Sequence, residues 1–223
     1  QAGQQASNVT RNAWLTAGIG YSPGATTIDC QCGSGAQANA FMQGLIATGG
    51  ARIGIGCGVE QMSQVPLGTA ARGGGGYYKD AETWPWDDPP NGQFGAAQRV
   101  AERRGITREQ LDELGVQSQK KAAVAWAEGR FDQEIVPVVD APQVDGNGEM
   151  TGEHIWVEKD QGLRETTIES LSKLRPVIEG ELHTAGTSSQ ISDGAAALVL
   201  MRLSEAEKRG LTPIAKISGH TSY

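Results

Sequence analysis

The stretch that most constrains the fold is a glycine-rich turn between a β-branched segment and an apolar helical one. Residues 26–29 are typical of the end of a strand, and the turn Cys32-Gly33-Ser34-Gly35 follows. Residues 36–46 have the apolar spacing of a helix, which Gly49-Gly50 would end. Residues 52–59 are apolar and short, which suits a buried strand. Strand, helix and strand with short links form a right-handed βαβ unit, which predicts a parallel sheet.

This arrangement puts Cys32 at or just before a helix N-terminus. Unpaired N–H groups and the positive end of the helix dipole meet there. Such surroundings favour the thiolate form of a cysteine, which is the reactive form in nucleophilic catalysis. The alternative is a buried structural cysteine, because free cysteine often packs as a small hydrophobic residue. The turn alone leaves both interpretations open.

Two motifs occur in the same order and at the same spacing as in the thiolases. The nucleophile motif of that family resembles Gln31-Cys32-Gly33-Ser34-Gly35-Ala36-Gln37-Ala38, and the strand that follows it resembles Gly56-Cys57-Gly58-Val59-Glu60-Gln61-Met62-Ser63. Residues 105–112 and 129–139 resemble the helical loop region of the family. Residues 173–176 and 184–197 resemble the segment in which that region returns to the core.

The resemblance implies an α/β fold with a thiolase-like layered αβα core and an inserted helical loop domain. We expect residues 1–65 to form part of the N-terminal core with the nucleophile turn. Residues 66–182 would form the inserted domain that binds coenzyme A (CoA) and substrate. Residues 183–223 would return to the core and begin the C-terminal half.

Three family motifs are absent from the sequence: Asn-Glu-Ala-Phe, Gly-His-Pro and a C-terminal Cys-x-Gly. In the family they carry the oxyanion-hole Asn, the base that activates the nucleophile and the acid/base Cys. His220 precedes Thr rather than Pro and is not assigned a catalytic role. The chain begins after the family's first strands and stops where its second half begins. We therefore expect an incomplete segment that does not catalyse thiolysis alone.

The implied activity is acyl transfer through an acyl-Cys32 thioester, either thiolytic cleavage of 3-ketoacyl-CoA or the reverse Claisen condensation. The alternative is a catalytically inactive thiolase-like protein that binds acyl-CoA. A dinucleotide-binding domain is a third interpretation, suggested by the glycines of residues 54–58. That stretch lacks the third glycine at the required step and the helix that should follow.

The resemblance also implies residues that contact CoA and substrate. Arg164 corresponds to an Arg at the nucleotide end of CoA. Ala185, Gly186 and Ser189 lie in the segment that touches the pantetheine arm. Gln93 and Phe94 stand where many members have His-Met, in the acyl and pantetheine pocket, so a bulky or long acyl chain is expected. Cys57 is expected to be a packed strand residue, and His183 a structural or exposed one.

Composition excludes several other classes of function. A net charge of -7 and a pI near 5.0 argue against a nucleic-acid surface. Three cysteines suit a reducing compartment, and we expect a cytoplasmic protein. The three scattered histidines argue against a metal site. No apolar run is long enough to span a bilayer. The resemblance further implies that CoA and acyl-CoA are substrates rather than permanent cofactors, and that the chain forms a homodimer or homotetramer through strand 52–59.

The remaining elements follow from periodicity and capping residues. Helices are predicted from Ser7 or Asn8 to residue 17, over 93–104, from a Thr107–Gln110 capping box to 127, over 167–174, and from a Ser204 cap to 209. Strands are predicted over 134–139, at a sheet edge because of Pro137, and over 155–157, 195–201 and 213–218. Residues 140–151 should form a polar turn, and residues 66–91 a long aromatic loop containing Tyr77, Tyr78, Trp84 and Trp86.

Overall fold

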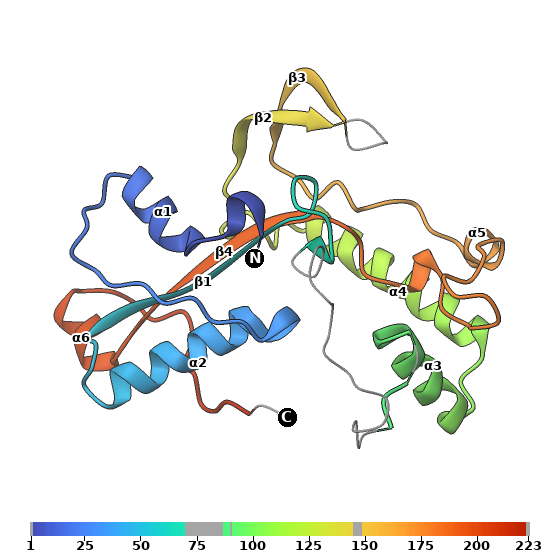
Figure 1. Ribbon diagram of the computed structural model, residues 1–223, viewed down its shortest axis with the longest axis horizontal. Coiled ribbons are helices and arrows are strands. Elements are labelled where there is room, and N and C mark those ends of the chain that lie inside the picture. The colour runs from blue at the N-terminus through green and yellow to red at the C-terminus, as the bar shows by residue number, and fades with distance from the viewer. Residues whose placement is uncertain (1, 70–86, 90, 145–148, 222–223) are drawn as a thin grey trace. The chain divides into compact units, whose positions relative to one another are not determined.

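The structure, a computed structural model, describes residues 2–69, 87–89, 91–144 and 149–221 (Figure 1). The chain forms two compact units. One contains residues 1–74 and 192–223, and the other contains residues 75–191. The four aromatic residues of the expected loop, Tyr77, Tyr78, Trp84 and Trp86, lie outside the described residues.

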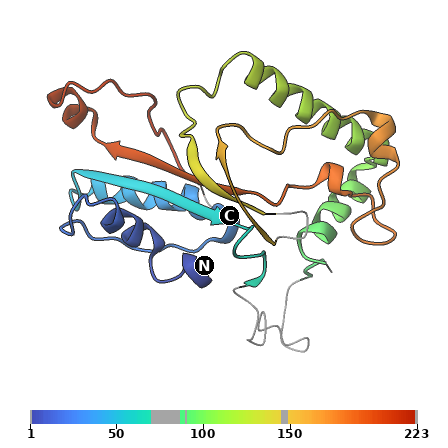
Figure 2. The same cartoon turned by 90° about the horizontal axis from the view of Figure 1, so that it is seen from above.

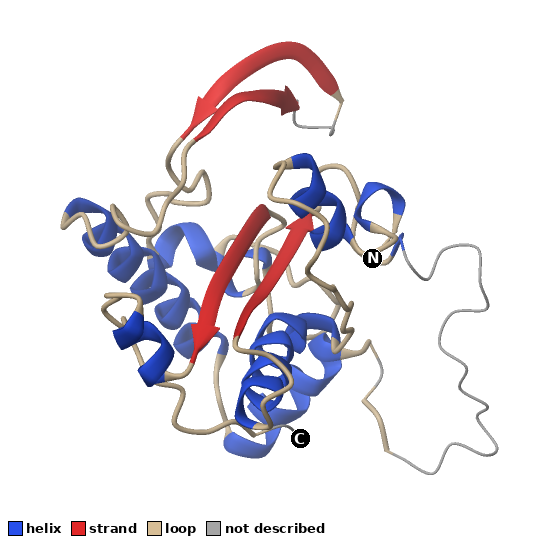
Figure 3. Ribbon diagram, turned by 90° about the vertical axis from the view of Figure 1, so that its left-hand side faces the viewer, coloured by secondary structure: helices blue, strands red, loops and turns tan. Residues whose placement is uncertain are grey.

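The first unit is built around a two-stranded antiparallel sheet. Strand β1 (Ile53–Gln61) pairs with β4 (Asp193–Met201), from Ile53 opposite Met201 to Gln61 opposite Asp193. Figure 3 shows the two strands side by side. The helices of this unit are α1 (Val9–Thr16), α2 (Ser34–Ala47) and α6 (Leu203–Lys208), with short 3₁₀ helices at Gly3–Gln5 (η1) and Gln31–Gly33 (η2). The strands predicted at 52–59 and 195–201 and the helix ending at the Gly49 turn are confirmed.

The predicted parallel βαβ unit is wrong. Residues 24–30 have no regular secondary structure, and the structure pairs no described strand with them. Thr26, Thr27 and Ile28 have side chains that favour strands, but that preference reflects packing on a pleated surface more than the backbone itself. Because no strand of the described residues pairs with it, the segment stays irregular. The described partner of β1 is an antiparallel strand from the far end of the chain.

The two faces of β1 differ in burial. Gly54 and Gly56 are buried on the face that α2 covers. On the other face, the residues Ile53, Ile55 and Val59 are each 38–39% exposed. The prediction of a buried strand therefore holds for one face only, because the described residues provide a covering helix on the glycine side.

Side-chain hydrogen bonds secure the start of α1 and the end of α2. Asn8 caps α1 by accepting from the backbone N–H of Arg11, which confirms the predicted cap. At the C-terminal end of α2, the Arg202 guanidinium donates to the carbonyls of Ile46 at 2.9 Å and Ala47 at 3.0 Å. The last carbonyls of a helix have no partner within the helix. Arg202, the residue that follows β4, therefore supplies donors to two carbonyls at the C-terminal end of α2.

The second unit consists mainly of helices. These are α3 (Gln93–Arg104), α4 (Arg108–Ala127), α5 (Ile168–Ser172) and the 3₁₀ turn η4 (Ala185–Thr187). The helices predicted at 93–104 and 167–174 are confirmed, and α4 begins at the predicted capping box, in which Thr107 and Gln110 bond to each other's backbone. The buried side chains that α4 and α5 contribute include Val116 and Leu171.

A β-hairpin also belongs to the second unit. Strands β2 (Val138–Val144) and β3 (Met150–Val157) pair in an antiparallel arrangement with two irregularities in register (Figure 2). The strand expected at 134–139 is wrong by about four residues, because β2 begins only after Pro137; β2 nevertheless contains Pro142, which lies opposite His154. The polar segment 140–151 contributes to both strands instead of forming only a turn.

Two further predictions near the C-terminus are wrong. Arg202, not Ser204, stands at the N-cap of α6, and Ser204 lies inside the helix. Residues 213–218 form no strand. None of the described helices is long and apolar enough to cross a membrane. The observed mixture of helices and strands agrees with an α/β class.

Candidate functional site

Cys32 occupies the middle of a tight turn that leads directly into α2. It is exposed and belongs to η2, two residues before Ser34, the first residue of α2. Gln31 has a φ of 51°, in the left-handed region that non-glycine residues seldom adopt. The turn therefore holds the residue before Cys32 in an unfavourable backbone conformation. Such conformations persist only where surrounding contacts enforce them.

Two polar side chains enforce this turn. The Ser34 hydroxyl accepts from the Cys30 N–H at 2.9 Å and donates to the Gln31 carbonyl at 2.7 Å. The Asp29 carboxylate accepts from the Gln31 N–H at 2.9 Å. Together these bonds fix the backbone on both sides of Cys32. The predicted position of Cys32 at the start of a helix is confirmed.

No side chain caps the N-terminal end of α2. Gly33 stands at the N-cap, and the first turn of the helix contains no acidic residue. The first N–H groups of a helix have no partner within it and carry a partial positive charge. Cys32 directly precedes these groups along the chain. This position suits a nucleophile, and the catalytic role of Cys32 stays a prediction.

The other two cysteines lie in different surroundings. Cys57 is half-buried on β1, and its sulfur lies 3.3 Å from the Thr10 hydroxyl of α1. Cys30 is exposed. The contact with Thr10 agrees with the expectation that Cys57 is a packed strand residue.

In the second unit, Arg164 is held through its main chain. The side-chain oxygen of Gln119, on α4, accepts from the Arg164 N–H at 3.2 Å, and the Gln119 amide donates to the Gly162 carbonyl at 3.4 Å. That carbonyl also accepts from the Gln190 amide at 3.0 Å. Gln190 follows Ser189 directly, so the segments that carry Arg164 and Ser189 meet at one carbonyl. The Arg164 side chain is exposed.

Ala185 and Gly186 form the η4 turn, which Thr184 organises. Thr184 is fully buried, with 0% exposure, and its hydroxyl accepts from the Gly186 N–H at 3.2 Å. The Thr184 carbonyl accepts from the Ser188 hydroxyl at 2.7 Å. Ser189 itself is exposed. The predicted pantetheine-contacting residues thus lie in and just beyond a turn that begins at the buried, hydrogen-bonded Thr184.

Gln93 and Phe94 occupy the first turn of α3. Phe94 is half-buried and Gln93 is exposed. Cys32 belongs to the first unit, whereas Gln93, Phe94, Arg164 and the residues of the η4 turn belong to the second.

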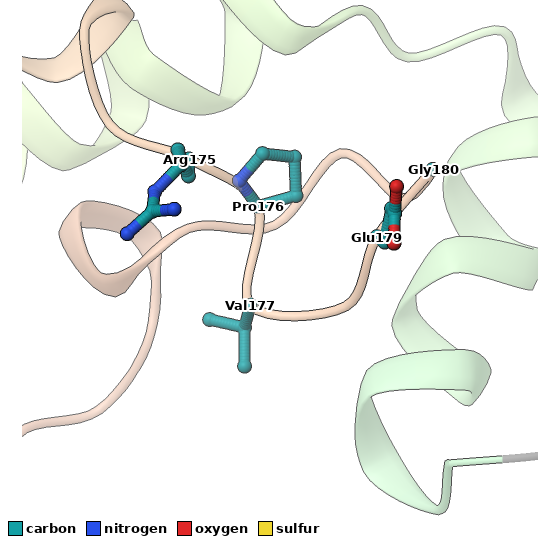
Figure 4. Close-up of a pocket in the computed structure, with 5 residues that line it drawn as sticks. All are labelled: Arg175, Pro176, Val177, Glu179 and Gly180. Carbon is teal, nitrogen blue, oxygen red and sulfur yellow. The ribbon is translucent and has the colours of Figure 1, made fainter.

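A depression on the second unit is lined by Arg175, Pro176, Val177, Glu179 and Gly180. Figure 4 shows Arg175 and Glu179 at opposite ends of it. No role was predicted for these residues. Sequence reasoning also missed Gln119 and Gln190, because their partners are distant along the chain and nothing local marks the pairing. In the described part of the chain, no group of three or more His, Cys, Asp or Glu residues would hold a metal ion.

Comparison with known proteins identifies the family. The profile of the thiolase N-terminal domain matches residues 1–204. The chain is 38% identical over 221 residues to a 3-ketoacyl-CoA thiolase of Marinobacter nauticus, covering 97% of this chain and 53% of that protein. It is 40% identical over 205 residues to the peroxisomal 3-ketoacyl-CoA thiolase A of Mus musculus, covering 91% and 47%.

A β-ketoadipyl-CoA thiolase of Pseudomonas putida is 39% identical over 236 residues, which covers all of this chain and 57% of that protein. The chain therefore spans about half the length of the relatives it matches. The profile match extends over most of the chain, from before the Cys32 turn to α6. The chain belongs to the thiolase family and corresponds to its N-terminal domain.

Proposed function

We propose that the intact protein is a thiolase-type acyltransferase that cleaves 3-ketoacyl-CoA thiolytically or catalyses the reverse Claisen condensation. The observation that carries this proposal is the position of Cys32 at the uncapped start of α2, in a chain of the thiolase family. A thiolate formed there is a nucleophile next to a partial positive charge.

In the cleavage direction, the Cys32 thiolate attacks the 3-keto carbon of the substrate. The bond between carbons 2 and 3 breaks, and its electron pair passes to carbon 2. This fragment takes up a proton and leaves as acetyl-CoA, while the shortened acyl group stays on Cys32 as a thioester. The CoA thiol then loses its proton, attacks the thioester and releases the shortened acyl-CoA, which regenerates the Cys32 thiolate.

We propose that CoA binds to the second unit. Arg164 would contact the nucleotide end, since an exposed guanidinium matches phosphate geometry and stacks on a purine. Ala185, Gly186 and Ser189 would contact the pantetheine arm. The buried base of the η4 turn and the hydrogen bonds that hold Arg164 support this assignment, because a binding surface needs fixed positions. Residues 66–182 would then be the inserted loop domain of the family.

Gln93 and Phe94 are proposed to line the acyl pocket. Phe94 supplies a rigid aromatic wall at the start of α3, which suits a bulky or long acyl chain. Comparing kcat/KM over a series of acyl chain lengths tests this assignment. A clear preference for acetoacetyl-CoA would contradict it.

We also propose self-association at least as a dimer, through β1. Among the described strands, β1 pairs only with β4, and an uncovered edge of an apolar strand invites pairing with another chain. A monomer in light scattering of the intact protein would contradict this proposal.

Acyl trapping in the intact protein tests the catalytic role of Cys32. Incubation with a 3-ketoacyl-CoA, acid quenching and peptide mass spectrometry should place the acyl group on Cys32. Cys32→Ser should lose both the acyl adduct and turnover, whereas Cys30→Ser and Cys57→Ser should retain the adduct. Binding of acyl-CoA without any adduct would identify an inactive binding protein instead. An adduct on Cys30 or Cys57 would show that the nucleophile is misassigned.

A further inference from the structure

A buried ion pair lies on the face of α4 that packs against the η4 turn. Asp112 is 1% exposed, and both of its carboxylate oxygens accept from the Arg108 Nε at 2.9 Å. The two residues are one helical turn apart on α4. A carboxylate buried to this degree needs a charged, hydrogen-bonded partner, because leaving it unpaired is very costly. Asp112 therefore fixes the position of the Arg108 side chain.

Arg108 also reaches a second helix. Its Nη2 donates to the carbonyl of Leu171 at 2.7 Å and to that of Leu174 at 3.1 Å. These carbonyls lie at and just beyond the C-terminal end of α5, and that of Leu171 also accepts from the Leu174 N–H at 2.9 Å. One guanidinium therefore joins the first turn of α4 to the end of α5, across more than 60 residues of sequence.

The same two leucines turn their side chains toward the η4 turn. A methyl group at Gly186 would overlap the Leu171 side chain and would lie 3.1 Å from Leu174 Cδ1. From the other side, a methyl group at Gly115 of α4 would lie 2.8 Å from the Gly186 carbonyl oxygen. Gly186 is thus wedged between α4 and α5, and the separation of these helices sets where the turn lies.

We propose that Asp112 is a positioning residue for CoA binding. The Asp112 carboxylate binds Arg108, and Arg108 donates to two carbonyls at the end of α5. The side chains of Leu171 and Leu174 in turn lie against Gly186. This inference rests on the proposed function, in which the η4 turn contacts the pantetheine arm. Loss of the Asp112 charge releases Arg108 from α4, and the turn loses its fixed position without losing any group that touches CoA.

The first test compares Asp112→Asn with Glu113→Gln in the intact protein. Glu113 is the next residue on α4 and is exposed, so it is a matched control. Asp112→Asn should raise KM for CoA about 3- to 30-fold, the usual range for residues that act through a packed network. The value of kcat at saturating CoA should change much less. Glu113→Gln should leave both constants unchanged.

Changing the acceptor thiol separates positioning from general damage. N-acetylcysteamine has the reactive thiol of CoA but lacks the nucleotide and most of the pantetheine arm. Asp112→Asn should therefore lower kcat/KM for CoA and leave kcat/KM for N-acetylcysteamine near the wild-type value. An equal loss with both thiols would overturn the proposal, because it would indicate disruption of the whole fold.

A second variant keeps the test informative if Asp112→Asn folds poorly. Replacing a buried ion pair by apolar residues of similar volume is often neutral for stability. The double variant Arg108→Met/Asp112→Leu removes the donor to the α5 carbonyls in this way. It should unfold near the wild-type urea midpoint and still show the raised KM for CoA. A urea midpoint and a KM for CoA that both match the wild type would mean that the ion pair does not position the turn.

Gly186→Ala distinguishes failure of this inference from failure of the proposed function. The added methyl group presses on Leu171 and should raise KM for CoA by displacing the turn. If Gly186→Ala raises KM and Asp112→Asn does not, the positioning role is wrong and the CoA assignment stands. If neither Gly186→Ala nor Ser189→Ala alters KM for CoA, the turn does not contact CoA, and both proposals are wrong.

Discussion

Alanine substitutions at three glycines on one face of β1 would test how closely α2 packs against the sheet. Gly54, Gly56 and Gly58 alternate along the strand and therefore point to the same face. A methyl group at Gly56 would overlap the Asn39 side chain and lie 3.1 Å from the Asn39 Cα atom, in the backbone of α2. A methyl group at Gly58 would meet nothing within 4 Å. These neighbours predict opposite effects for the same substitution.

Gly58→Ala should stabilise the intact protein by about 0.4–1 kcal/mol, because alanine restricts the unfolded chain and the site has free space. Gly56→Ala has the same entropic gain but must push α2 away from β1, and overpacking typically costs about 1–3 kcal/mol. The net effect should be a loss of up to about 2.6 kcal/mol. Gly54→Ala should fall between the two, because it meets only the flexible end of Met42.

Urea unfolding of the three variants, followed by circular dichroism, measures these differences in unfolding free energy. The order of stability should be Gly58→Ala, then Gly54→Ala, then Gly56→Ala. Equal stability of Gly56→Ala and Gly58→Ala would refute the close contact between α2 and β1. It would also remove the contact that holds the N-terminal half of α2, the half that follows the Cys32 turn, against the sheet.

Helix caps and the side-chain contacts of Gln119 give two further predictions. Thr107→Ala should lower the unfolding free energy by about 1 kcal/mol in urea titrations, because the α4 cap is lost, whereas Ser204→Ala should change it by less than about 0.5 kcal/mol. Gln119→Met removes both hydrogen bonds to the Arg164 segment at constant side-chain length. It should weaken binding of CoA but not of pantetheine in calorimetry, with Gln117→Met on the exposed side of α4 as control; equal weakening of both ligands would contradict the role of Gln119.

The helices of the second unit could be predicted from sequence because their signals are local. The Thr107 capping box marks the start of α4, and Gly129, with a φ of 67°, follows its end. Gly105, at a φ of 62°, likewise ends α3. Each of these signals lies within a few residues of the boundary that it sets. Such boundaries therefore need no knowledge of the rest of the fold.

The sheet could not be predicted in the same way, because its pairing is non-local. A strand preference at residues 26–29 says nothing about whether a neighbour exists, and the partner of β1 begins only at Asp193. For the candidate site, the sequence places Cys32 correctly at a helix start, since the turn and helix are contiguous. It does not reveal Gln119 or the Asp112–Arg108 link to α5, since each contact spans more than 40 residues.

The first unit is built from two segments that lie far apart in the sequence, and this affects how it folds during synthesis. Ser63, just after β1, bonds to Asp193, the first residue of β4, across 130 residues of chain. At about 5–20 residues per second, β1 leaves the ribosome roughly 7–26 s before its partner strand. During that interval its edges are open to other chains, and folding must wait for a distant segment. Nascent chains arrested before residue 193 should therefore show no hydrogen-exchange protection along β1, while α4, which depends on local signals, can already be protected.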